Sequence, residues 1–383
     1  MTEVVVAATG IVPFAKETPL SVDMLAAGAV RELFDGSGVD PGLVEEAYVG
    51  TAKGGGLIGQ RSLRFAGLAS GLPIFNVESA CASSAVAFHL ARRAISDSGV
   101  ECALVVGVDK LSTLGKGALP VQETEWEGQA GVTNPVVYAM RANRYMHETG
   151  ATVEDLARVS VKARQFASAN PIAHMRTKVT VDEVLQSRMV ADPLTLYQCS
   201  PKSDGAAAVL LVSDGLARHA GVTGPRVRAT VVKSGRFSLA ERDITRPDIT
   251  LRASQEAFAD AGIGPEEFDV VELHDAFSIA ELLYSEELGL CPEGEAPRFL
   301  QSGESSSLEP SKSALVNPSG GLMGRGHPIG ATGAAQIVEL TNQLMGRASS
   351  QREGARTGMA HVTGGGASGF DNGACAVTIL TVD

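Results

Sequence analysis

One cysteine of the chain, Cys81, occupies a position suited to nucleophilic chemistry. It follows the strand-like segment NVESA and begins a stretch, ASSAVAFHLARRAI, in which most residues are small or apolar. A helix of this kind is buried, and its first turn presents free N–H groups and a partial positive charge. Such groups stabilise a thiolate and an oxyanion, so we expect a lowered pKa and a nucleophilic role for Cys81. The alternative, a buried small hydrophobic residue, applies better to Cys102 and Cys375, which fall inside predicted strands.

A histidine, His327, stands in a comparable place in the segment GRGHPIGATGAAQIVEL. The glycines before it and Pro328 after it predict a tight loop that leads into a helix. A histidine at a helix N-terminus tends to stay neutral and can act as a general base. A phosphate-binding loop built on the neighbouring glycines is the weaker interpretation, because neither G-x-G-x-x-G nor G-x-x-x-x-G-K-[ST] spacing is present.

Two further segments bring polar groups to the ends of predicted strands. His274 and Asp275 follow the apolar run DVVEL, at the carboxyl end where open α/β sheets bind ligands. His274 can donate a hydrogen bond or hold a water, and Asp275 can orient it. The segment HVTGGGASG begins at His361, and its glycines leave backbone N–H groups free for an oxyanion, although a plain glycine-rich turn is an equally good explanation.

The elements that must position these residues alternate between buried strands and helices rich in small residues. Eight apolar runs predict the strands. They begin at Val4, Glu45, Cys102 and Ala206 in the first part of the chain, and at Arg226, Asp269, Gly358 and Asn372 in the second. The order of strands and helices predicts an α/β fold.

The two series of runs resemble each other, which predicts an internal duplication. SDGAAAVLLVSD aligns with DNGACAVTILTVD, and GSGVDPGLVEEAYVG aligns with DAGIGPEEFDVVELH. By this alignment the helices that follow Cys81 and His327 are counterparts, so their N-termini are expected to converge on one site.

The aligned pairs are separated by unequal lengths of chain, which indicates an insertion in the first half between its third and fourth predicted strands. We predict a first half made of residues 1–111 and 203–222, an inserted loop domain of residues 112–202, and a second half of residues 223–383. Long insertions on a rigid α/β scaffold usually serve binding, and a structural cap or subunit contact is the alternative.

Composition limits the class of protein. The chain has 383 residues, 44% of them hydrophobic, which is enough for a large core in one or two domains. The formal charge of −12 argues against a nucleic-acid or membrane partner. No apolar run reaches the length of a membrane helix and the first residues lack a signal-peptide pattern, so a cytoplasmic location is expected. Five dispersed cysteines with no clustered histidines predict no disulfide framework and no metal site.

The ordered set CASS, HDAF, NPSGG followed by GHPIGATG, and a terminal GGG before NGACAVTIL resembles the thiolase superfamily. Within it, the chain is most similar to the sterol-carrier-protein-2 type and archaeal thiolases, which carry HDxF. The resemblance covers essentially the whole chain. It implies a duplicated five-layer α-β-α-β-α fold in a dimer or tetramer, and acyl transfer from coenzyme A thioesters, used as substrates in lipid metabolism without a further cofactor.

The resemblance also implies roles for individual residues. Cys81 corresponds to the nucleophile, and His327 to the histidine that activates it. His274 corresponds to a histidine that helps to form an oxyanion hole. A second hole would join the Cys81 N–H to a glycine N–H in the terminal loop, at Gly364 or a neighbour. Basic residues of the insertion, such as Lys162 and Arg164, could meet coenzyme A phosphates, but exposed basic residues are usually only solvated, so none is assigned to the site.

The chain departs from the typical pattern in one respect. Typical thiolases have a second cysteine that moves the proton of the substrate α-carbon, in the terminal loop or, in some sterol-carrier types, as HDCF. Here the HDxF position is Ala276, and the terminal loop reads His361, Val362, Thr363. Loss of such a general acid/base typically costs ~10²- to 10⁴-fold in rate. By position, His361 is the first candidate to replace it, and a histidine satisfied inside a buried loop is the alternative.

The leading interpretation is therefore an acyltransferase that works through an acyl-Cys81 intermediate, of the acetyl-CoA acetyltransferase or 3-ketoacyl-CoA thiolase type. Two alternatives stay open. One is a thiolase-like retro-aldol lyase that acts on acyl-CoA with a small OB-fold partner protein. The other is a non-catalytic thiolase-like subunit.

Overall fold

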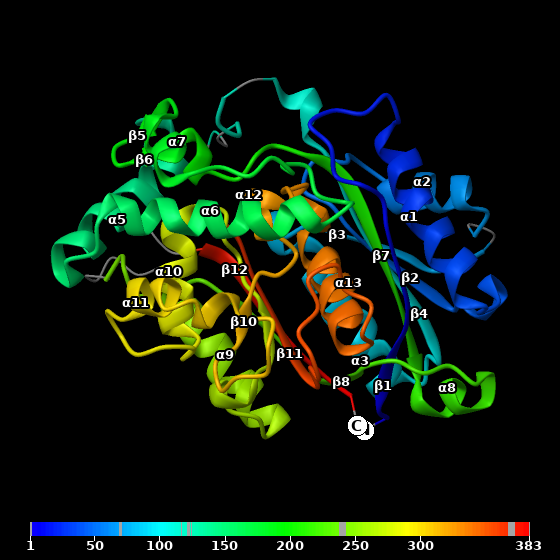
Figure 1. Cartoon of the computed structure of the whole chain (residues 1–383). Coiled ribbons are helices and arrows are strands. Elements are labelled where there is room, and N and C mark those ends of the chain that lie inside the picture. The colour runs from blue at the N-terminus through cyan, green and yellow to red at the C-terminus, as the bar shows by residue number, and fades with distance from the viewer. Residues whose placement is uncertain are drawn as a thin grey trace.

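The structure, a computed structural model, describes residues 2–68, 71–115, 117–120, 123, 125–236, 243–366 and 372–382. Ten strands form one continuous sheet, whose two five-stranded halves, called here the first and the second sheet, join where Val5 pairs with Arg226. The two halves enclose a central layer of helices, and further helices cover the outer face of each (Figure 1). The layers therefore run α-β-α-β-α, as the resemblance implies.

The two sheets repeat one topology. The first half contributes β1 (Val4–Ile11), β2 (Glu46–Gly50), β3 (Ile74–Val77), β4 (Cys102–Lys110) and β7 (Asp204–Ser213), in the order β3-β2-β4-β7-β1. The second half contributes β8 (Arg226–Ser234), β9 (Val270–Glu272), β10 (Leu315–Val316), β11 (Thr357–Gly366) and β12 (Asn372–Thr381), in the order β10-β9-β11-β12-β8. In each half the first three strands of this order are parallel and the next two pairings are antiparallel. The duplicated fold is confirmed.

All eight predicted strands are present, and the described residues form four more that were not predicted: β3, β10 and two short strands of the insertion, Met189–Ala191 and Leu194–Thr195. The additional strands β3 and β10 are short, with four and two residues, so they carry no long apolar run. The run that begins at Asp269 is shorter as a strand than predicted: β9 ends at Glu272, and the residues that follow it form a loop. That loop carries His274.

The central layer consists of α3 (Ser83–Ser98) and α13 (Thr332–Leu344), each preceded by one 3-10 turn: η2 (Ala80–Ala82) and η7 (Ile329–Ala331). The two helices approach closely because their facing residues are small. A Cβ atom on Gly333 would lie 2.6 Å from the Ala85 backbone nitrogen, and Ala334 N donates to Ser84 Oγ at 2.9 Å. Both helices contact strands of both sheets, so their N-terminal turns meet in the middle of the molecule.

The outer layers are helices with one apolar face. On the first sheet lie α1 (Val22–Ser37), which begins where Ser21 Oγ accepts from Met24 N, and α2 (Ile58–Ala66). On the second sheet, α9 (Asp248–Ala261) packs against β8 and β12, and α10 (Ser278–Glu287) packs against α9. Three shorter helices complete these halves: α8 (Asp214–Ala220), α11 (Ala296–Gln301) and α12 (Gly321–Gly324).

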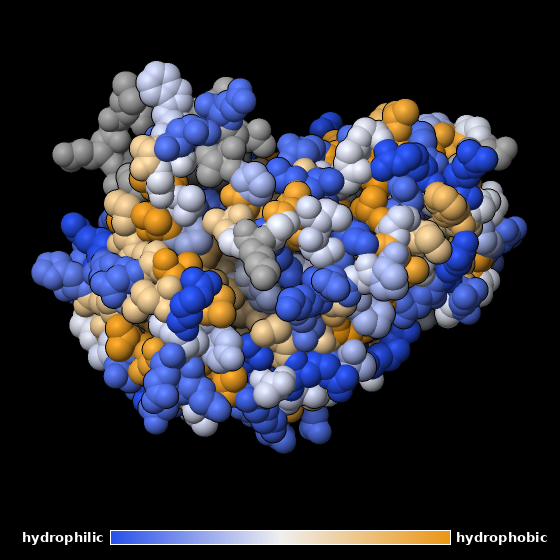
Figure 2. Space-filling view, turned by 90° about the horizontal axis from the view of Figure 1, so that it is seen from above, coloured by the Kyte–Doolittle hydropathy of each residue, from blue (hydrophilic) through white to orange (hydrophobic). Residues whose placement is uncertain are grey.

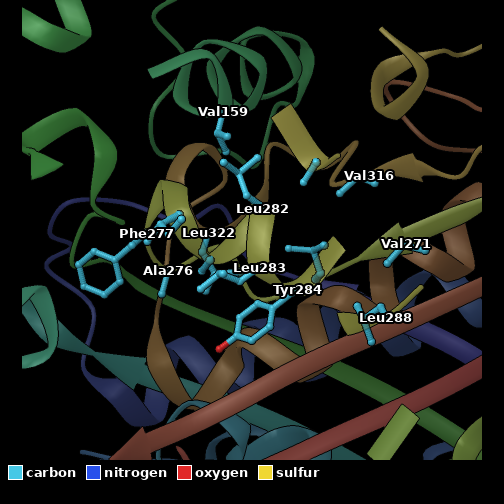
Figure 3. Packing of buried hydrophobic residues seen from close by; sticks show 14 of the residues in the cluster. Val159, Val271, Ala276, Phe277, Leu282, Leu283, Tyr284, Leu288, Val316 and Leu322 are labelled. Atoms are coloured by element: carbon cyan, nitrogen blue, oxygen red, sulfur yellow. The ribbon is translucent and has the colours of Figure 1, made fainter. Parts of the chain in front are cut away.

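Between β4 and β7 the chain forms a separate set of elements, whereas β11 in the second half leads directly to β12. The set comprises α4 (Trp126–Gln129), α5 (Asn134–Thr149), α6 (Val153–Ala169), α7 (Val181–Gln186), β5 (Met189–Ala191) and β6 (Leu194–Thr195). It packs on the second half: α6 contacts α10, α11 and α12, and Val159 lies against Leu282 in the shared core (Figure 3). The borders of the three predicted regions stay a prediction. Within the described ranges, no helix is long and apolar enough to cross a bilayer.

Candidate active site

Three side chains from distant parts of the sequence meet at the centre of the molecule. One ligating atom each of Cys81, His274 and His327 lies within 4.8 Å of the other two. The two imidazole rings stand edge to face, with centroids 5.4 Å apart. Three of the four predicted catalytic side chains are thus brought together, the cysteine by the first half of the fold and the two histidines by the second. Their spacing would also admit a soft metal ion, for which thiolate and imidazole are suitable ligands.

The turn before Cys81 has an unusual backbone. Ala80 has a φ of +48°, a left-handed conformation that is rare for a residue with a side chain. Two hydrogen bonds hold it: Ala80 N donates to Glu78 Oε1 at 2.8 Å, and Ser83 Oγ donates to the Ala80 carbonyl at 2.6 Å. Strained residues of this kind persist where the surrounding structure fixes them, and they are common at active sites.

The pKa predicted for Cys81 is corrected by the structure. Burial of the sulfur raises the pKa of Cys81 to about 12, and the negative charges of Asp109 and Glu78 act in the same direction. Backbone N–H groups of Gly365 and of Cys81 itself oppose this effect but do not overcome it. The expected lowering at a helix N-terminus is wrong here because desolvation disfavours the thiolate more than the N–H groups favour it. The resting group is a neutral thiol, and its reaction requires a base.

His327 has the properties of that base. Burial lowers the pKa of His327 to about 3, with a smaller contribution from the charge of Arg325, so the ring is neutral at physiological pH. Its Nδ1 lies 2.8 Å from Thr332 Oγ1, and that hydroxyl is 3.3 Å from the carbonyl of Pro328. A hydroxyl that donates to Pro328 accepts from Nδ1–H, which leaves the Nε2 lone pair as proton acceptor. Sequence reasoning did not single out Thr332, although it stands only five residues after His327.

His274 lies at the site as a neutral ring, and one of its ring nitrogens makes no hydrogen bond to the described residues. Burial is the main cause that lowers its pKa far below the ordinary value, and protonation of His327 or His361 would lower it further. Its Nδ1 is buried with no hydrogen-bond partner among the described residues. A buried polar atom without a partner is costly, so a group bound at this site is expected to supply one. A carbonyl oxygen accepting from His274 would do so.

The loop that carries His274 is fixed by hydrogen bonds to the segment NPSGG. Leu273 N donates to Asn317 Oδ1 at 2.8 Å, and Leu322 N donates to Asp275 Oδ1 at 2.7 Å. Asp275 therefore anchors the loop through the Leu322 backbone. Asn317 itself has a positive φ of 54°, and these two hydrogen bonds fix the two loops in one relative position.

Beneath these loops lies a layer of buried ion pairs. Glu272 pairs with Arg325 at 3.1 Å, and Glu281 pairs with Lys162 at 2.6 Å; all four side chains are buried. Lys162, considered above for coenzyme A phosphates, is therefore structural and connects α6 of the insertion to α10. Of the other insertion residues with positive charge, Arg164 is also buried, and its guanidinium lies over the Tyr197 ring.

The glycine loop at the end of β11 meets the nucleophile. A Cβ atom on Gly364 would lie 2.2 Å from the Ser79 carbonyl, so only glycine fits there. The N–H that donates to the Cys81 sulfur belongs to the next residue, Gly365, whose φ is +43°. The predicted donor was the N–H of Gly364 or a neighbour. In the structure it is the N–H of Gly365 that meets the sulfur. Only the geometry could distinguish the two, because the glycines are adjacent and identical.

His361 does not join the cluster. Its Nε2 lies 3.1 Å from Thr250 Oγ1 in α9, and its ring packs on Tyr284, with centroids 4.6 Å apart. Side chains alternate along a strand, so His361 and its neighbour Val362, which packs with Ala82 beside the nucleophile, lie on opposite faces of β11. Burial lowers the pKa of His361 to about 3. This geometry gives no support to the role in α-proton transfer predicted for His361.

Comparison with known proteins agrees with the fold. The family profile described as "Thiolase, N-terminal domain" matches residues 4–215, and that described as "Thiolase C-terminal domain-like" matches residues 232–372. Among solved structures, an Ltp2-ChsH2(DUF35) aldolase shares the fold, with a TM-score of 0.83 over 100% of this chain and 98% of the other at 24% identity.

Three relatives match this chain over most of its length. The chain is 41% identical over 370 residues to the benzoylsuccinyl-CoA thiolase subunit BbsB of Thauera aromatica, covering 95% of each chain. It is 41% identical to an acetyl-CoA acetyltransferase of Methanothermobacter thermautotrophicus, covering 90% of this chain and 91% of the relative. To sterol carrier protein 2 of Gallus gallus it is 33% identical, covering 99% and 72%. On the profiles, the relatives and the shared architecture, this chain belongs to the thiolase superfamily.

Proposed function

We propose that the chain is a thiolase-type acyltransferase that forms an acyl-Cys81 intermediate. The meeting of Cys81, His274 and His327 at one point is the observation that carries this proposal. His327 Nε2 takes the thiol proton as the sulfur attacks the carbonyl carbon of an acyl thioester. The carbon–sulfur bond to coenzyme A then breaks, and the departing thiolate takes that proton from His327.

Two sets of hydrogen-bond donors would stabilise the oxyanions of such a reaction. The N–H groups of Cys81 and Gly365, both directed at the sulfur, would hold the oxygen of the acyl group bound to Cys81. His274, whose Nδ1 has no partner among the described residues, would polarise the carbonyl of the second substrate. A carbon nucleophile or free coenzyme A then takes the acyl group from Cys81.

The substrate class follows from the relatives, two of which are named for coenzyme A thioesters. We therefore propose acyl-CoA as the substrate, with coenzyme A as leaving group and no further cofactor. Lipid metabolism and a cytoplasmic location belong to the same proposal. Three basic residues of the insertion, Arg144, Arg176 and Lys178, are exposed and remain available to the phosphates, whereas Lys162 is not.

A homodimer or homotetramer is supported by the edge of the first sheet. β3 is an edge strand, and the half-exposed ring of Phe75 stacks on Tyr48 at its surface, with centroids 5.0 Å apart. Exposed apolar side chains of α2 and the residue before it, Phe65 and Leu57, surround the same edge. An unpaired edge with apolar neighbours is a suitable surface for a second copy of the chain.

The intact mass of the purified chain after incubation with a panel of acyl-CoA thioesters tests the proposal. We expect one acyl increment per chain, absent in Cys81→Ala and retained in Cys199→Ala, a partly buried cysteine outside the cluster. An increment that survives in Cys81→Ala would overturn the mechanism. The thioesters that produce the increment also define the acyl group.

A retro-aldol lyase is the second candidate, because neither Ala276 nor the segment from His361 to Thr363 supplies a second cysteine. The structural neighbour is named an aldolase with a DUF35 protein, and one relative is named a subunit. The insertion leaves several large apolar side chains exposed, which suits a partner protein such as the predicted small OB-fold protein. They are Trp126, Met140, Met189 and Leu196. Figure 2, which views the molecule from above Figure 1, shows apolar groups among charged ones on the face that it presents.

The two candidates differ in their need for the nucleophile. Acyl transfer requires Cys81, whereas retro-aldol cleavage does not pass through an acyl-cysteine. Carbon–carbon cleavage that persists in Cys81→Ala would favour the lyase. A non-catalytic subunit would show neither an acyl increment nor cleavage.

A further inference from the structure

The second half of the proposed reaction needs a group that the catalytic cluster does not supply. When Cys81 carries the acyl group, making or breaking a carbon–carbon bond requires a proton to leave or reach the α-carbon of the other thioester. Cys81 is then bonded to the acyl group, and His274 polarises the carbonyl of the second substrate. The position after the histidine and aspartate of HDAF is Ala276, whose side chain has no acidic or basic group. His361 is directed at Thr250.

Two buried tyrosines lie between these positions. Tyr138 of α5 stacks on Phe277, the neighbour of Ala276, with ring centroids 4.5 Å apart and planes inclined by 23°. Tyr284 of α10 lies with its hydroxyl 3.3 Å from Thr363 Oγ1 in the terminal loop. The two phenol oxygens are 3.2 Å apart. Figure 3 shows Tyr284 in the same core cluster as Ala276 and Phe277, its hydroxyl directed away from the helix backbone.

The pair forms one hydrogen-bonded unit. Asn372 Nδ2 donates to the Tyr284 oxygen at 3.2 Å, which leaves the Tyr284 proton for Thr363 or Tyr138. The guanidinium carbon of Arg141 stands 4.8 Å from the centre of the Tyr138 ring. A phenolate formed at Tyr138 would be stabilised by the Tyr284 hydroxyl and by this positive charge.

The unit also contacts the strand that leads into the glycine loop. Thr363 is followed directly by Gly364 and by Gly365, whose N–H donates to the Cys81 sulfur. The charge of Cys81 is among the influences on the pKa of Tyr138, which burial raises well above its ordinary value. Tyr138 is therefore protonated at neutral pH.

We propose that Tyr138, hydrogen-bonded to Tyr284, exchanges the proton of the substrate α-carbon, the task that a second cysteine performs in typical thiolases. The inference rests on the proposed function. In the cleavage direction the Cys81 sulfur bonds to the 3-keto carbon and the bond to the α-carbon breaks. The electron pair passes to the α-carbon, which takes the proton of the Tyr138 hydroxyl. The proton that His327 took from Cys81 restores the phenol, and condensation follows the same steps in reverse.

The test separates the two halves of the reaction. Acetyl-CoA is incubated with the enzyme in deuterium oxide, and two quantities are followed: the acyl increment on Cys81 and deuterium incorporation at the acetyl methyl group. In Tyr138→Phe we expect acylation to persist and deuterium incorporation to fall about a hundredfold. Tyr284→Phe removes only the supporting hydrogen bond, so incorporation is expected to fall less.

Two matched variants distinguish chemistry from folding. Tyr145→Phe removes a buried hydroxyl from the same helix whose partner is Glu286, and it is expected to change neither quantity. Ala276→Cys, added to Tyr138→Phe, places a thiol at the HDxF position and is expected to restore incorporation. Incorporation in Tyr138→Phe equal to that of the unaltered chain would overturn the inference. An unaltered chain that forms no acyl-Cys81 with any thioester would instead overturn the proposed function.

Discussion

At the catalytic residues, burial sets the protonation state of both partners. It raises the pKa of the Cys81 thiol to about 12 and lowers the pKa of His327 to about 3, so both groups are uncharged at neutral pH. A neutral pair avoids the cost of an isolated ion pair inside the protein. The proton moves only when a substrate carbonyl is present to receive the developing charge.

The pH dependence of alkylation tests this neutral pair. Iodoacetamide reacts with the thiolate, and a thiol with a pKa near 12 is almost wholly protonated at pH 7. We expect the rate of Cys81 alkylation, followed on its peptide by mass spectrometry, to rise about tenfold per pH unit from pH 7 to pH 10. A free thiol such as glutathione, with a pKa of ~8.5, levels off in this range. A plateau for Cys81 below pH 8 would show a resting thiolate and contradict the assignment.

Thr332 orients His327, so loss of the Thr332 hydroxyl is expected to slow acylation while Cys81, His274 and His327 stay in place. Thr332→Val keeps the shape but loses the hydroxyl that meets His327 Nδ1 at 2.8 Å. We expect the acylation rate to fall roughly tenfold or more, as for other residues that orient a catalytic imidazole. Thr332→Ser is expected to preserve the rate.

The matched control is Thr341→Val on the same helix. Thr341 is also buried, but its hydroxyl has no hydrogen-bond partner among the described residues. The acylation rate of this variant should equal that of the unaltered chain, and its stability should be equal or greater because an unsatisfied polar group is removed. Equal rates for Thr332→Val and Thr341→Val would exclude an orienting role for Thr332.

For single residues, the sequence predicts which side chains form the site better than it predicts their surroundings. Cys81, His274 and His327 could be identified because their segments are distinctive. The direction of the Cys81 pKa shift could not, since it depends on how completely the sulfur is desolvated. The orientation of His361 depends on which face of β11 it occupies, and a displacement of one residue reverses that face.

At the scale of elements, the site depends on the close approach of α3 and α13. Their N-terminal turns bring Cys81 and His327 together, and the helices can approach only where side chains are absent or small. Gly333 stands at this contact, with Ala85 opposite it.

Gly333→Ala is therefore expected to separate the helices. The new Cβ would lie 2.6 Å from atoms of Ala85, so α3 must shift, and the free energy of unfolding should fall by about 1–3 kcal/mol. Acylation should fall as well, because the shift moves the turn that carries Cys81. Thermal unfolding and the acyl increment measure the two effects.

Gly36→Ala is the control for this substitution. Gly36 lies inside α1, with nothing within 4 Å of the added Cβ, and alanine favours the helix. This variant should be more stable by about 0.5–1 kcal/mol. If Gly333→Ala were stabilised equally, the close approach would not limit the packing of the helices.

Long apolar strands could be predicted at this scale, but short edge strands could not. β3 and β10 lie at opposite edges of their sheets and are defined by pairing with β2 and β9 rather than by their own pattern. Their existence follows from the topology that the duplication repeats.

For the whole molecule, the buried pair between Lys162 and Glu281 connects the insertion to the second half. Glu281 also accepts from Asn317 Nδ2 at 3.3 Å, and Asn317 holds the loop of His274. The insertion therefore packs on the second half and also helps to fix the loop that carries His274. Its presence was predictable from the unequal spacing of the duplicated segments, but its contact with the second half was not, because nothing in the local pattern specifies a distant partner.

Lys162→Met is expected to leave Glu281 as an unpaired buried charge and to lower the free energy of unfolding by about 3–5 kcal/mol. Adding Glu281→Gln removes that charge and keeps an acceptor for Asn317, so part of the loss should be recovered. Arg144→Met breaks an exposed pair with Glu148 on α5 and should cost less than about 1 kcal/mol. Equal losses for Lys162→Met and Arg144→Met, measured by chemical unfolding, would contradict a supporting role for the buried pair.

The division of the site between the two repeats has a consequence for biosynthesis. The nucleophile belongs to the repeat that leaves the ribosome first, whereas His274, His327 and the glycine loop belong to the repeat that leaves last. A nascent or truncated chain that ends before the second repeat therefore holds Cys81 without a base and without the Gly365 donor. Acyl transfer through Cys81 therefore requires the folded contact between the two repeats, and neither repeat alone is expected to carry it out.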